Sequence, residues 1–218
     1  MSGREHPALR LAAGAAVAAA LWASATAAAA PLYAVVPGQS ALSFNGTQQG
    51  EKFTGTIRDF DAKIAYAADD LAGSKLDVTI GVKSIDTRSP DRDQALGTAD
   101  WFDFAKFPTA TFRTLAIRAT PAGPAGDAEL TIKGHTKRIE FPFVWKAAGG
   151  GATLDARVTL DRLDFGLGAG DWADESMVGR KVEVVVHLTL AAVAAPPPAA
   201  SPAKPAAAPA AKPKATGR

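Results

Sequence analysis

The sequence of 218 residues contains no cysteine, so neither disulfides nor cysteine-ligated metal centres can stabilise the fold. Histidine is also scarce: of the three histidines, His6 lies close to the N-terminus, which leaves His135 and His187. Two isolated histidines without an H-E-x-x-H spacing do not predict a metal site. The stability of the protein must therefore come from apolar burial and hydrogen bonding.

Neither sign of charge dominates the chain. The formal net charge is +2, but the C-terminal tail carries four basic residues and the first 27 residues carry a net charge of +1. Residues 28–195 therefore carry a formal charge of −3, which disfavours a nucleic-acid-binding protein. No glycine-rich loop leads from a strand into a helix, so the sequence predicts no nucleotide site and no cofactor.

Both ends of the chain differ in composition from the middle. Arg4 and Arg10 precede the uncharged run "LAAGAAVAAALWASATAAAA", a layout that predicts a cleavable secretory signal peptide over residues 1–27. An uncleaved membrane anchor is the alternative. Residues 196–218 are almost wholly Ala, Pro and Lys and cannot bury enough apolar surface to fold, so we expect a disordered tail. Residues 28–195 then form one domain.

Apolar and polar residues alternate wherever the domain shows a pattern. Every second residue from Val182 to Leu190 is apolar, and residues 76–82 repeat the alternation. Residues 128–145 predict a hairpin with a turn at residues 134–136. Eight or nine strands, each apolar on one face, must pack against another sheet or close on themselves. We expect an all-β fold, an antiparallel eight-stranded barrel, because several strands are long; a sandwich is the alternative.

The segment of residues 89–114 departs from this alternation. Ser89 before Pro90, followed by acidic residues, predicts the start of a short helix with Ser89 as its capping side chain, and Gly97 predicts its end. A segment that we call the aromatic block follows, with Trp101, Phe102, Phe104 and Phe107, and a strand begins only after Pro108. We therefore expect one short helix that caps a barrel mouth, with the aromatic block as a lid or plug.

The ordered set of segments in the domain resembles one known family. The segments are "YAVVPGQSALSF", "RDQALGTADWFDFAKFPTATFRT", "AELTIKGHTKRIEFPF", "LDRLDFGLG" and "MVGRKVEVVVHLTL", within residues 32–191. Together they resemble the YceI-like family of secreted lipid-binding proteins. The resemblance implies an extended lipocalin-like barrel, exported to the periplasm, whose apolar cavity holds a polyisoprenoid or a similar amphiphile. The tail lies outside the resemblance and inherits no role from it.

Two groups of residues are candidates for contact with a ligand. The first combines the aromatic block with residues on apolar strand faces: Phe44, Trp101, Phe102, Phe107, Phe112, Ile132, Phe141, Phe143 and Trp145. The alternative is that these side chains fill a solid core. The second group could bind a phosphate head group at the hairpin rim, or could be ordinary surface charge on a solvated turn: Lys133, His135, Lys137 and Arg138.

Two classes of function are consistent with the sequence. The first is a soluble periplasmic protein that holds an apolar, isoprenoid-like lipid for transport, storage or sequestration. The second is a ligand-free structural or envelope-interaction module with a packed barrel and a Pro/Lys tail that contacts the cell envelope. The sequence predicts no catalytic residue, and the acidic stretch "DFGLGAGDWADES" lacks the spacing of a calcium loop. A transient envelope contact and a homodimer are left open as further partners.

Overall fold

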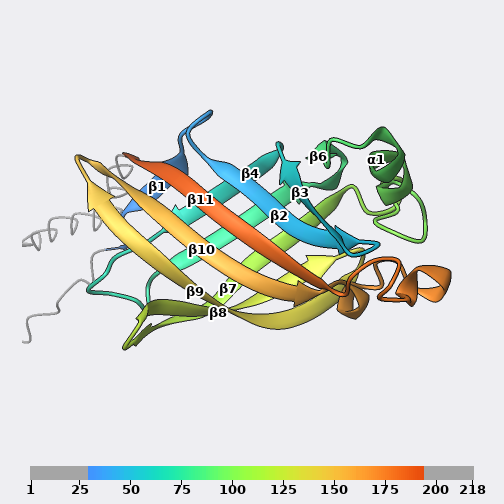
Figure 1. Cartoon of the computed structure of the whole chain (residues 1–218). Helices are drawn as coiled ribbons and strands as arrows, with labels where there is room; N and C mark the ends of the chain where they lie inside the picture. Colours follow the sequence, from blue (N-terminus) through green and yellow to red (C-terminus); the bar gives the residue numbers. More distant parts are fainter. Residues whose placement is uncertain (1–28, 194–218) are drawn as a thin grey trace, which may run out of the picture.

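The computed structural model describes residues 29–193, so the predicted signal peptide and tail lie outside the described residues. Figure 1 shows a barrel with short helices gathered at one end. The strands are β1 (Leu32–Val35), β2 (Ala41–Gln48), β3 (Glu51–Ile57), β4 (Phe60–Ala65), β5 (Lys75–Gly81), β6 (Ile85–Asp86), β7 (Thr109–Thr120), β8 (Gly123–Ile132), β9 (His135–Ala148), β10 (Gly151–Asp161) and β11 (Lys181–Val193). The helices are α1 (Pro90–Leu96) and three 3-10 turns, η1 (Val82–Ser84), η2 (Arg162–Phe165) and η3 (Gly170–Ala173).

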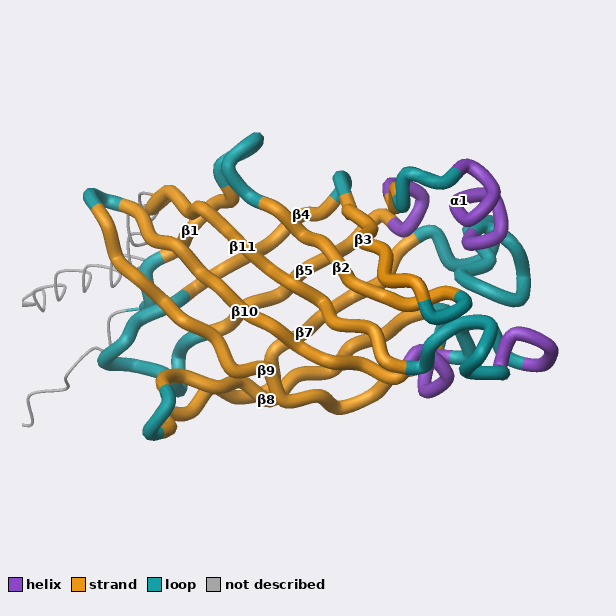
Figure 2. Tube along the Cα trace, viewed as in Figure 1, coloured by secondary structure: helices purple, strands orange, loops and turns teal. Residues whose placement is uncertain are grey.

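The sheet closes on itself. Eight strands follow one another in the order β1-β4-β5-β7-β8-β9-β10-β11, all pairs are antiparallel, and β11 pairs back onto β1. The β1–β11 pairing leaves neither end of this eight-strand series as an open edge. Figure 2 shows these strands crossing the barrel at a tilt, as closure requires. The expected eight-stranded antiparallel barrel is confirmed, and the sandwich is excluded.

Strand β11 is longer than β1 and β2, the two strands that pair with it on the side away from β10. It pairs with β1 over residues 190–193 and with β2 over residues 183–187, so β1 and β2 lie end to end along it. Residues 36–40 connect them, and Gly38 there has a φ of +75°, which glycine adopts without steric cost. Strands β3 and β6 pair outward from β2 and extend the wall toward the end that carries α1.

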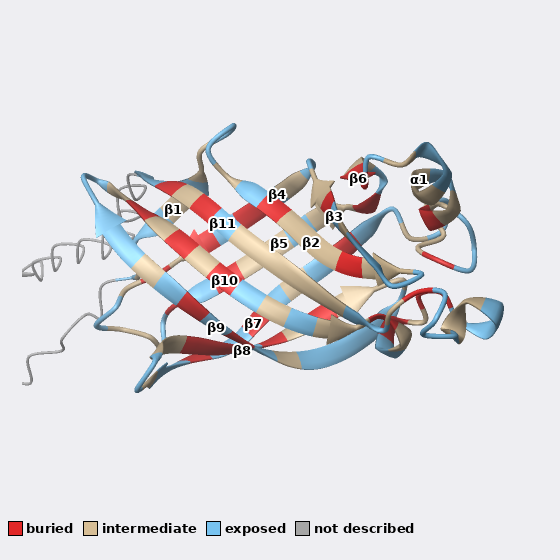
Figure 3. Cartoon of the chain, in the orientation of Figure 1, coloured by how far each residue is buried: buried red, intermediate tan, exposed pale blue. Residues whose placement is uncertain are grey.

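The interior of the barrel is mostly apolar. Thr114 of β7 is one buried polar exception, and its hydroxyl donates to the Leu76 carbonyl at 2.6 Å. Figure 3 shows bands of buried and exposed residues along the strands, as expected from the alternation in the sequence. Two clusters of buried residues follow each other along the axis. The cluster that we call the body includes Ile64, Leu76, Phe141, Leu154 and Leu188, and the second cluster includes Val82, Leu96, Trp101, Phe165 and Leu167.

The second cluster lies at the end of the barrel that we call the mouth. The mouth consists of α1, residues 97–108 and residues 162–180, which gather at the right-hand end in Figure 1. Strand β7 begins at Thr109, so the aromatic block is outside the sheet, as expected. Helix α1 begins at Pro90 and ends at Leu96, also as expected.

The capping of α1 differs from the prediction. The side chain of Ser89 makes no capping hydrogen bond, although its carbonyl accepts the N–H of Asp93 at 2.9 Å. The Asp93 carboxylate instead accepts hydrogen bonds from the backbone N–H and the hydroxyl of Thr87, at 2.9 and 2.6 Å. A side chain inside the first turn therefore fixes the chain that enters the helix, a contact that local spacing does not reveal.

The hairpin between β8 and β9 turns earlier than predicted. Its two turn residues are Lys133 and Gly134, with φ of +49° and +76°, while His135 and Thr136 already belong to β9 and pair with Ile132 and Thr131. Two-residue hairpin turns favour positive φ at both central positions because this matches the twist of the strands. The predicted turn at residues 134–136 was therefore wrong.

Candidate ligand-binding cavity

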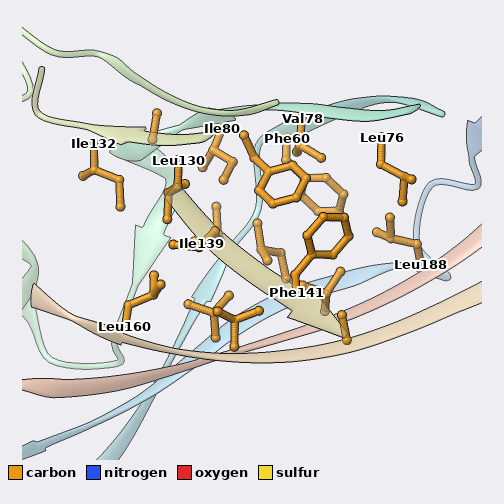
Figure 4. A pocket seen from close by; sticks show the side chains of 18 of the residues that line it. Phe60, Leu76, Val78, Ile80, Leu130, Ile132, Ile139, Phe141, Leu160 and Leu188 are labelled. Carbon is orange, nitrogen blue, oxygen red and sulfur yellow. The ribbon is translucent and has the colours of Figure 1, made fainter. Parts of the chain in front are cut away.

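A space of about 170 Å³ lies inside the barrel and is lined only by apolar side chains. They come from strands all around the barrel and include Leu76 and Leu188 toward the body and Ile132 and Leu160 toward the mouth. Figure 4 shows these side chains converging on one space, with carbon atoms alone at their tips. A space of this kind can hold an apolar chain by contact and burial, without any directed polar bond.

The lining follows directly from strand pairing. Val78, Phe112 and Leu130 are successive partners across β5, β7 and β8, and all three line the cavity. Because side chains alternate between the two faces of each strand, one register places every second residue of these strands inside. The alternation read from the sequence therefore identifies the wall of the cavity.

The predicted ligand residues occupy three different places. Phe102, Phe112, Ile132 and Phe141 line the cavity. Phe44 and Trp101 line a second pocket of about 370 Å³ at the mouth, and Phe102 lines that pocket as well. Phe102 therefore lies between the two spaces and is the one member of the aromatic block that borders both.

Three predicted aromatics line neither space among the described residues. Phe107 packs its ring against Gly134 in the β8–β9 turn. Phe143 is buried and stacks on Phe141, with ring centres 5.5 Å apart. Trp145 lies at the opposite end of the barrel from the mouth, in contact with Tyr33 and Tyr66 at ring distances of 5.0 and 4.3 Å. The aromatic positions are thus divided between cavity, core and far end.

The mouth pocket differs from the cavity in its chemistry. Aromatic rings from Phe44, Phe53, Trp101 and Trp172 form part of its wall, and so do three charged residues. The charged residues are Asp91, Arg92 and Arg162. The protein therefore presents an apolar space in the barrel followed by an amphipathic space at the mouth.

Arg162 holds the loops of the mouth together, and it is not among the site residues predicted from the sequence. Its side chain is 3% exposed. All five of its N–H groups donate to backbone carbonyls, namely those of Leu167, Gly168, Trp172, Val178 and Gly179. Burial lowers the pKa of the guanidinium, while the charge of Asp161 opposes that shift. One side chain therefore ties residues 167–179 to the end of β10.

The alternation of inward and outward residues along β10 does point to Arg162. Leu154, Ala156, Val158 and Leu160 are the inward-facing residues of β10, and position 162 is next in that series. A charged residue at an expected inward position needs partners, and here the carbonyls of a folded loop provide them.

Trp101 connects the aromatic block to this loop. Its ring lies 5.4 Å from the guanidinium carbon of Arg162, a cation–π contact, and the neighbouring Asp100 carbonyl accepts the N–H of Gly168 at 2.8 Å. Gly168 has a φ of +63°, and a Cβ atom there would come within 2.8 Å of the Trp101 ring. Close approach of the two loops therefore requires glycine at this position.

The four predicted head-group residues do not converge on one site. Lys133 donates to the Gly166 carbonyl at 2.9 Å, and His135 lies against the same glycine. Lys137 pairs with Asp164 at 3.7 Å, while Arg138 pairs with Glu129 at 4.0 Å. The contacts of Lys133, His135 and Lys137 hold the hairpin against η2 and Gly166, so this part of the hairpin rim takes part in packing the mouth, whereas Arg138 pairs within the hairpin. Its role in binding a head group stays a prediction.

Within residues 29–193, no group of three or more His, Cys, Asp or Glu side chains is placed to hold a metal ion. None of the helices in this range is long and apolar enough to cross a membrane.

Comparison with known proteins identifies the family of this barrel. Residues 33–190 match the family described as the YceI-like domain. The chain belongs to the YceI-like family. The resemblance read from the sequence is therefore confirmed over most of the domain.

Curated relatives support the same assignment. A UPF0312 protein of Ectopseudomonas mendocina is 34% identical over 118 residues, which cover 51% of this chain and 62% of that protein. Protein YceI of an Escherichia coli strain is 34% identical over 85 residues, covering 39% of this chain and 44% of that protein. The matched segments span less than two thirds of the length of these relatives.

Solved structures share the barrel. BcnA of Burkholderia cenocepacia superposes with a TM-score of 0.68 at 29% identity, covering 71% of this chain and 98% of BcnA. A polyisoprenoid-binding domain from Saccharophagus degradans superposes with a TM-score of 0.60 at 15% identity, covering 75% of this chain and 99% of that domain. The second likeness concerns the fold alone.

Proposed function

We propose that this protein binds an isoprenoid-like or other amphiphilic lipid in the barrel cavity and carries, stores or sequesters it in the periplasm, without catalysing a reaction. The observation that carries the proposal is the closed barrel with a purely apolar interior space. A packed structural barrel has no need of such a space, because interiors normally fill to crystal-like density.

The energetics of burial are sufficient for such a ligand. Burying roughly 600 Å² of hydrocarbon surface is worth on the order of 15 kcal/mol gross at 25 cal/mol/Å². Association and ordering of the ligand cost several kcal/mol or more and reduce this value. The polyisoprenoid-binding name of the Saccharophagus degradans domain supports the choice of ligand class, since that domain shares the fold.

The first test is the lipid itself. Organic extraction of the purified protein followed by mass spectrometry should release a long-chain amphiphile at a molar ratio near that of the protein. Ala110 lines the cavity on β7, so Ala110→Leu should reduce this ratio by filling the space. Ala119→Leu is the matched control, because the same substitution lies on an exposed position of the same strand. Lipid-free wild-type protein would favour the structural module instead.

The periplasmic location rests on the predicted signal peptide, which lies outside the described residues. Intact-mass measurement on periplasmic extract should give a protein that has lost about 27 residues, as expected for a leader of this length. Recovery of the full-length chain with membranes only would contradict this part of the proposal and would leave ligand binding unaffected.

A further inference from the structure

The end of the barrel opposite the mouth carries a hollow of about 670 Å³, which we call the far-end groove. Three of its wall residues are aromatic: Tyr33, Tyr66 and Trp145. We propose that the proline- and lysine-rich tail of the same chain docks in this groove as a polyproline helix, with the segment Pro202–Pro205 on the three rings. The inference does not depend on the proposed function, because it concerns neither the cavity nor a lipid.

The three rings form one continuous aromatic surface. The centre of the Trp145 ring lies 5.0 Å from that of Tyr33, at an angle of 76°, and 4.3 Å from that of Tyr66, at 35°. Most of the other wall residues are alanines, whose small side chains leave the rings accessible from the groove. Grooves lined by aromatic residues bind polyproline helices, because such a helix is formed in advance and loses little conformational entropy on docking.

The polar atoms of these rings also suit a polyproline helix. Such a helix makes no internal hydrogen bonds, so its carbonyls can accept hydrogen bonds from a binding surface. Within residues 29–193, neither the Tyr66 hydroxyl nor the Trp145 indole N–H takes part in a hydrogen bond. In this range only Trp101 Nε1 is fully buried without a partner, so both donors keep surface that a carbonyl oxygen can reach.

The groove and the tail carry charges of opposite sign. Asp69 and Asp70 line the groove, and its described wall includes no lysine or arginine. Within residues 29–193, neither carboxylate takes part in an ion pair. Residues 196–218 include four basic residues and no acidic one. Lys204 lies inside the proposed docking segment, so its ammonium group comes next to these carboxylates.

The proline spacing of the tail selects the docking segment. Residues 202–205 read P-A-K-P, and this is the one place in the tail where two prolines stand three positions apart. A polyproline helix has three residues per turn, so Pro202 and Pro205 lie on the same side of it and can contact one aromatic surface together. The P-x-x-P spacing is the one that aromatic grooves recognise.

The tail also begins beside the groove. Strand β11 ends at Val193, which pairs with Leu32 of β1, and the next residue of β1 is Tyr33. Figure 1 shows β1 beside the last part of β11, at the end of the barrel away from α1. Residues 194–201 can span up to about 25 Å, enough to bring the docking segment onto the rings. A tether this short gives an effective concentration on the order of millimolar, so even a weak contact is populated.

The test uses the lack of cysteine in the chain. Ala206→Cys creates a single attachment site for a nitroxide, next to the docking segment and outside it. A nitroxide broadens the NMR signals of nearby protons. In the chain as the cell processes it, the indole N–H signal of Trp145 should be broadened. The signals of Trp101 and Trp172, which lie at the mouth, should stay sharp and serve as internal controls.

Matched proline variants separate docking from the effect of the tether alone. Pro202→Ala combined with Pro205→Ala should lower the relaxation enhancement at Trp145 by at least about three-fold, because the tethered segment then no longer binds. Pro209→Ala combined with Pro213→Ala removes two prolines that stand four positions apart and should leave the enhancement unchanged. Both pairs leave every residue of the barrel in place, so a difference between them cannot come from unfolding.

The charge contact has a smaller expected effect. Lys204→Gln should lower the enhancement less than the loss of Pro202 and Pro205, because an ion pair at the surface contributes little. Lys212→Gln removes the same charge outside the docking segment and should have no effect.

Two outcomes would overturn the inference. The first is equal broadening of the Trp145 signal in the two double-proline variants, which would mean that the tail passes the groove without docking. The second is broadening in a mixture of an isotope-labelled chain without nitroxide and an unlabelled chain with it, which would place the tail on a second copy. Neither outcome changes the lipid recovered by organic extraction, so the proposed function is tested separately.

Discussion

The body and the mouth of this barrel are held together by different interactions. In the body, strand pairs close a ring and many apolar side chains each contribute a share of the buried surface. In the mouth, loops far apart in the sequence meet around one buried guanidinium that serves five carbonyls. Many side chains therefore share the stabilisation of the body, whereas a single side chain holds the loops of the mouth together.

This difference matters for a protein that must admit and release a large ligand. A closed ladder of backbone hydrogen bonds opens only at high cost, so the body is a rigid container. The mouth lies outside the ladder, and its pocket borders the cavity at Phe102. We expect entry and exit of ligand at the mouth, where local rearrangement breaks few strand pairs.

The largest expected effect comes from removing the centre of the mouth. Arg162→Met should lower the free energy of unfolding by at least about 4 kcal/mol, because each buried carbonyl left without a donor costs roughly 1–3 kcal/mol. Urea denaturation followed by tryptophan fluorescence measures the change. Arg157→Met is the control: this arginine of β10 is largely exposed and pairs with Glu183, so its loss should cost less than about 1 kcal/mol.

Similar costs for the two arginine variants would contradict the contrast between body and mouth. They would mean that the loops of residues 167–179 are held by other contacts. A large loss for Arg162→Met with native-like ligand retention in the surviving folded protein would separate the stability of the mouth from its role in holding lipid.

The next largest effect distinguishes two neighbours in the aromatic block. Trp101 is buried against Arg162, so Trp101→Ala should cost about 3 kcal/mol or more in stability. Phe102 is only half-buried and borders both spaces, so Phe102→Ala should cost less, about 1–2 kcal/mol. Thermal unfolding and quantified co-purified lipid, measured on both variants, should show lipid depletion in Phe102→Ala at modest loss of stability.

If Phe102→Ala retained as much lipid as the wild type, Phe102 would pack the fold and would not confine the ligand to the cavity. If Trp101→Ala were nearly neutral, the aromatic block would be a loose lid. The two substitutions therefore test separately whether each ring packs the fold or confines the ligand.

The sequence predicts the body far better than the mouth, for a physical reason. Strand alternation is local, so Phe112, Ile132 and Phe141 could be placed on the inward face, and all three line the cavity. The partners of Arg162 are carbonyls of a loop that folds only in tertiary context, and no local pattern identifies them. Composition also cannot tell a packing ring from a lining ring, because the side chain is the same in both places. Phe107 packs against Gly134, whereas Phe112 lines the cavity.

A smaller effect is expected for a change in the body. Ile139 lines the cavity on β9, and Ile139→Val removes one methylene group from a wall built of many side chains. The cost should be about 1 kcal/mol in the free energy of unfolding. Co-purified lipid should remain near the wild-type amount, and depletion as strong as in Phe102→Ala would argue against the mouth as the place that controls retention.

The smallest expected effect is on the pH dependence of the free energy of unfolding, through Asp161. Asp161 joins the end of β10 to the mouth: it accepts hydrogen bonds from Arg180 at 2.7 Å and from the N–H of Leu163 at 3.0 Å, and Lys181 is 3.6 Å away. Burial acts to raise the pKa of Asp161, but these hydrogen bonds and positive charges outweigh it and lower the pKa below its ordinary value.

A carboxylate whose pKa is lower in the folded state stabilises the fold above its unfolded pKa, about 4, and loses that contribution as the pH falls further. Asp161→Asn should therefore lower stability at pH 7 by at most about 1 kcal/mol, since Arg180 is partly exposed. It should also flatten the loss of stability between pH 5 and pH 2, measured by urea denaturation at each pH. An unchanged acid profile in Asp161→Asn would show that the ion pairs at this junction add nothing to the anchoring that Arg162 gives the mouth.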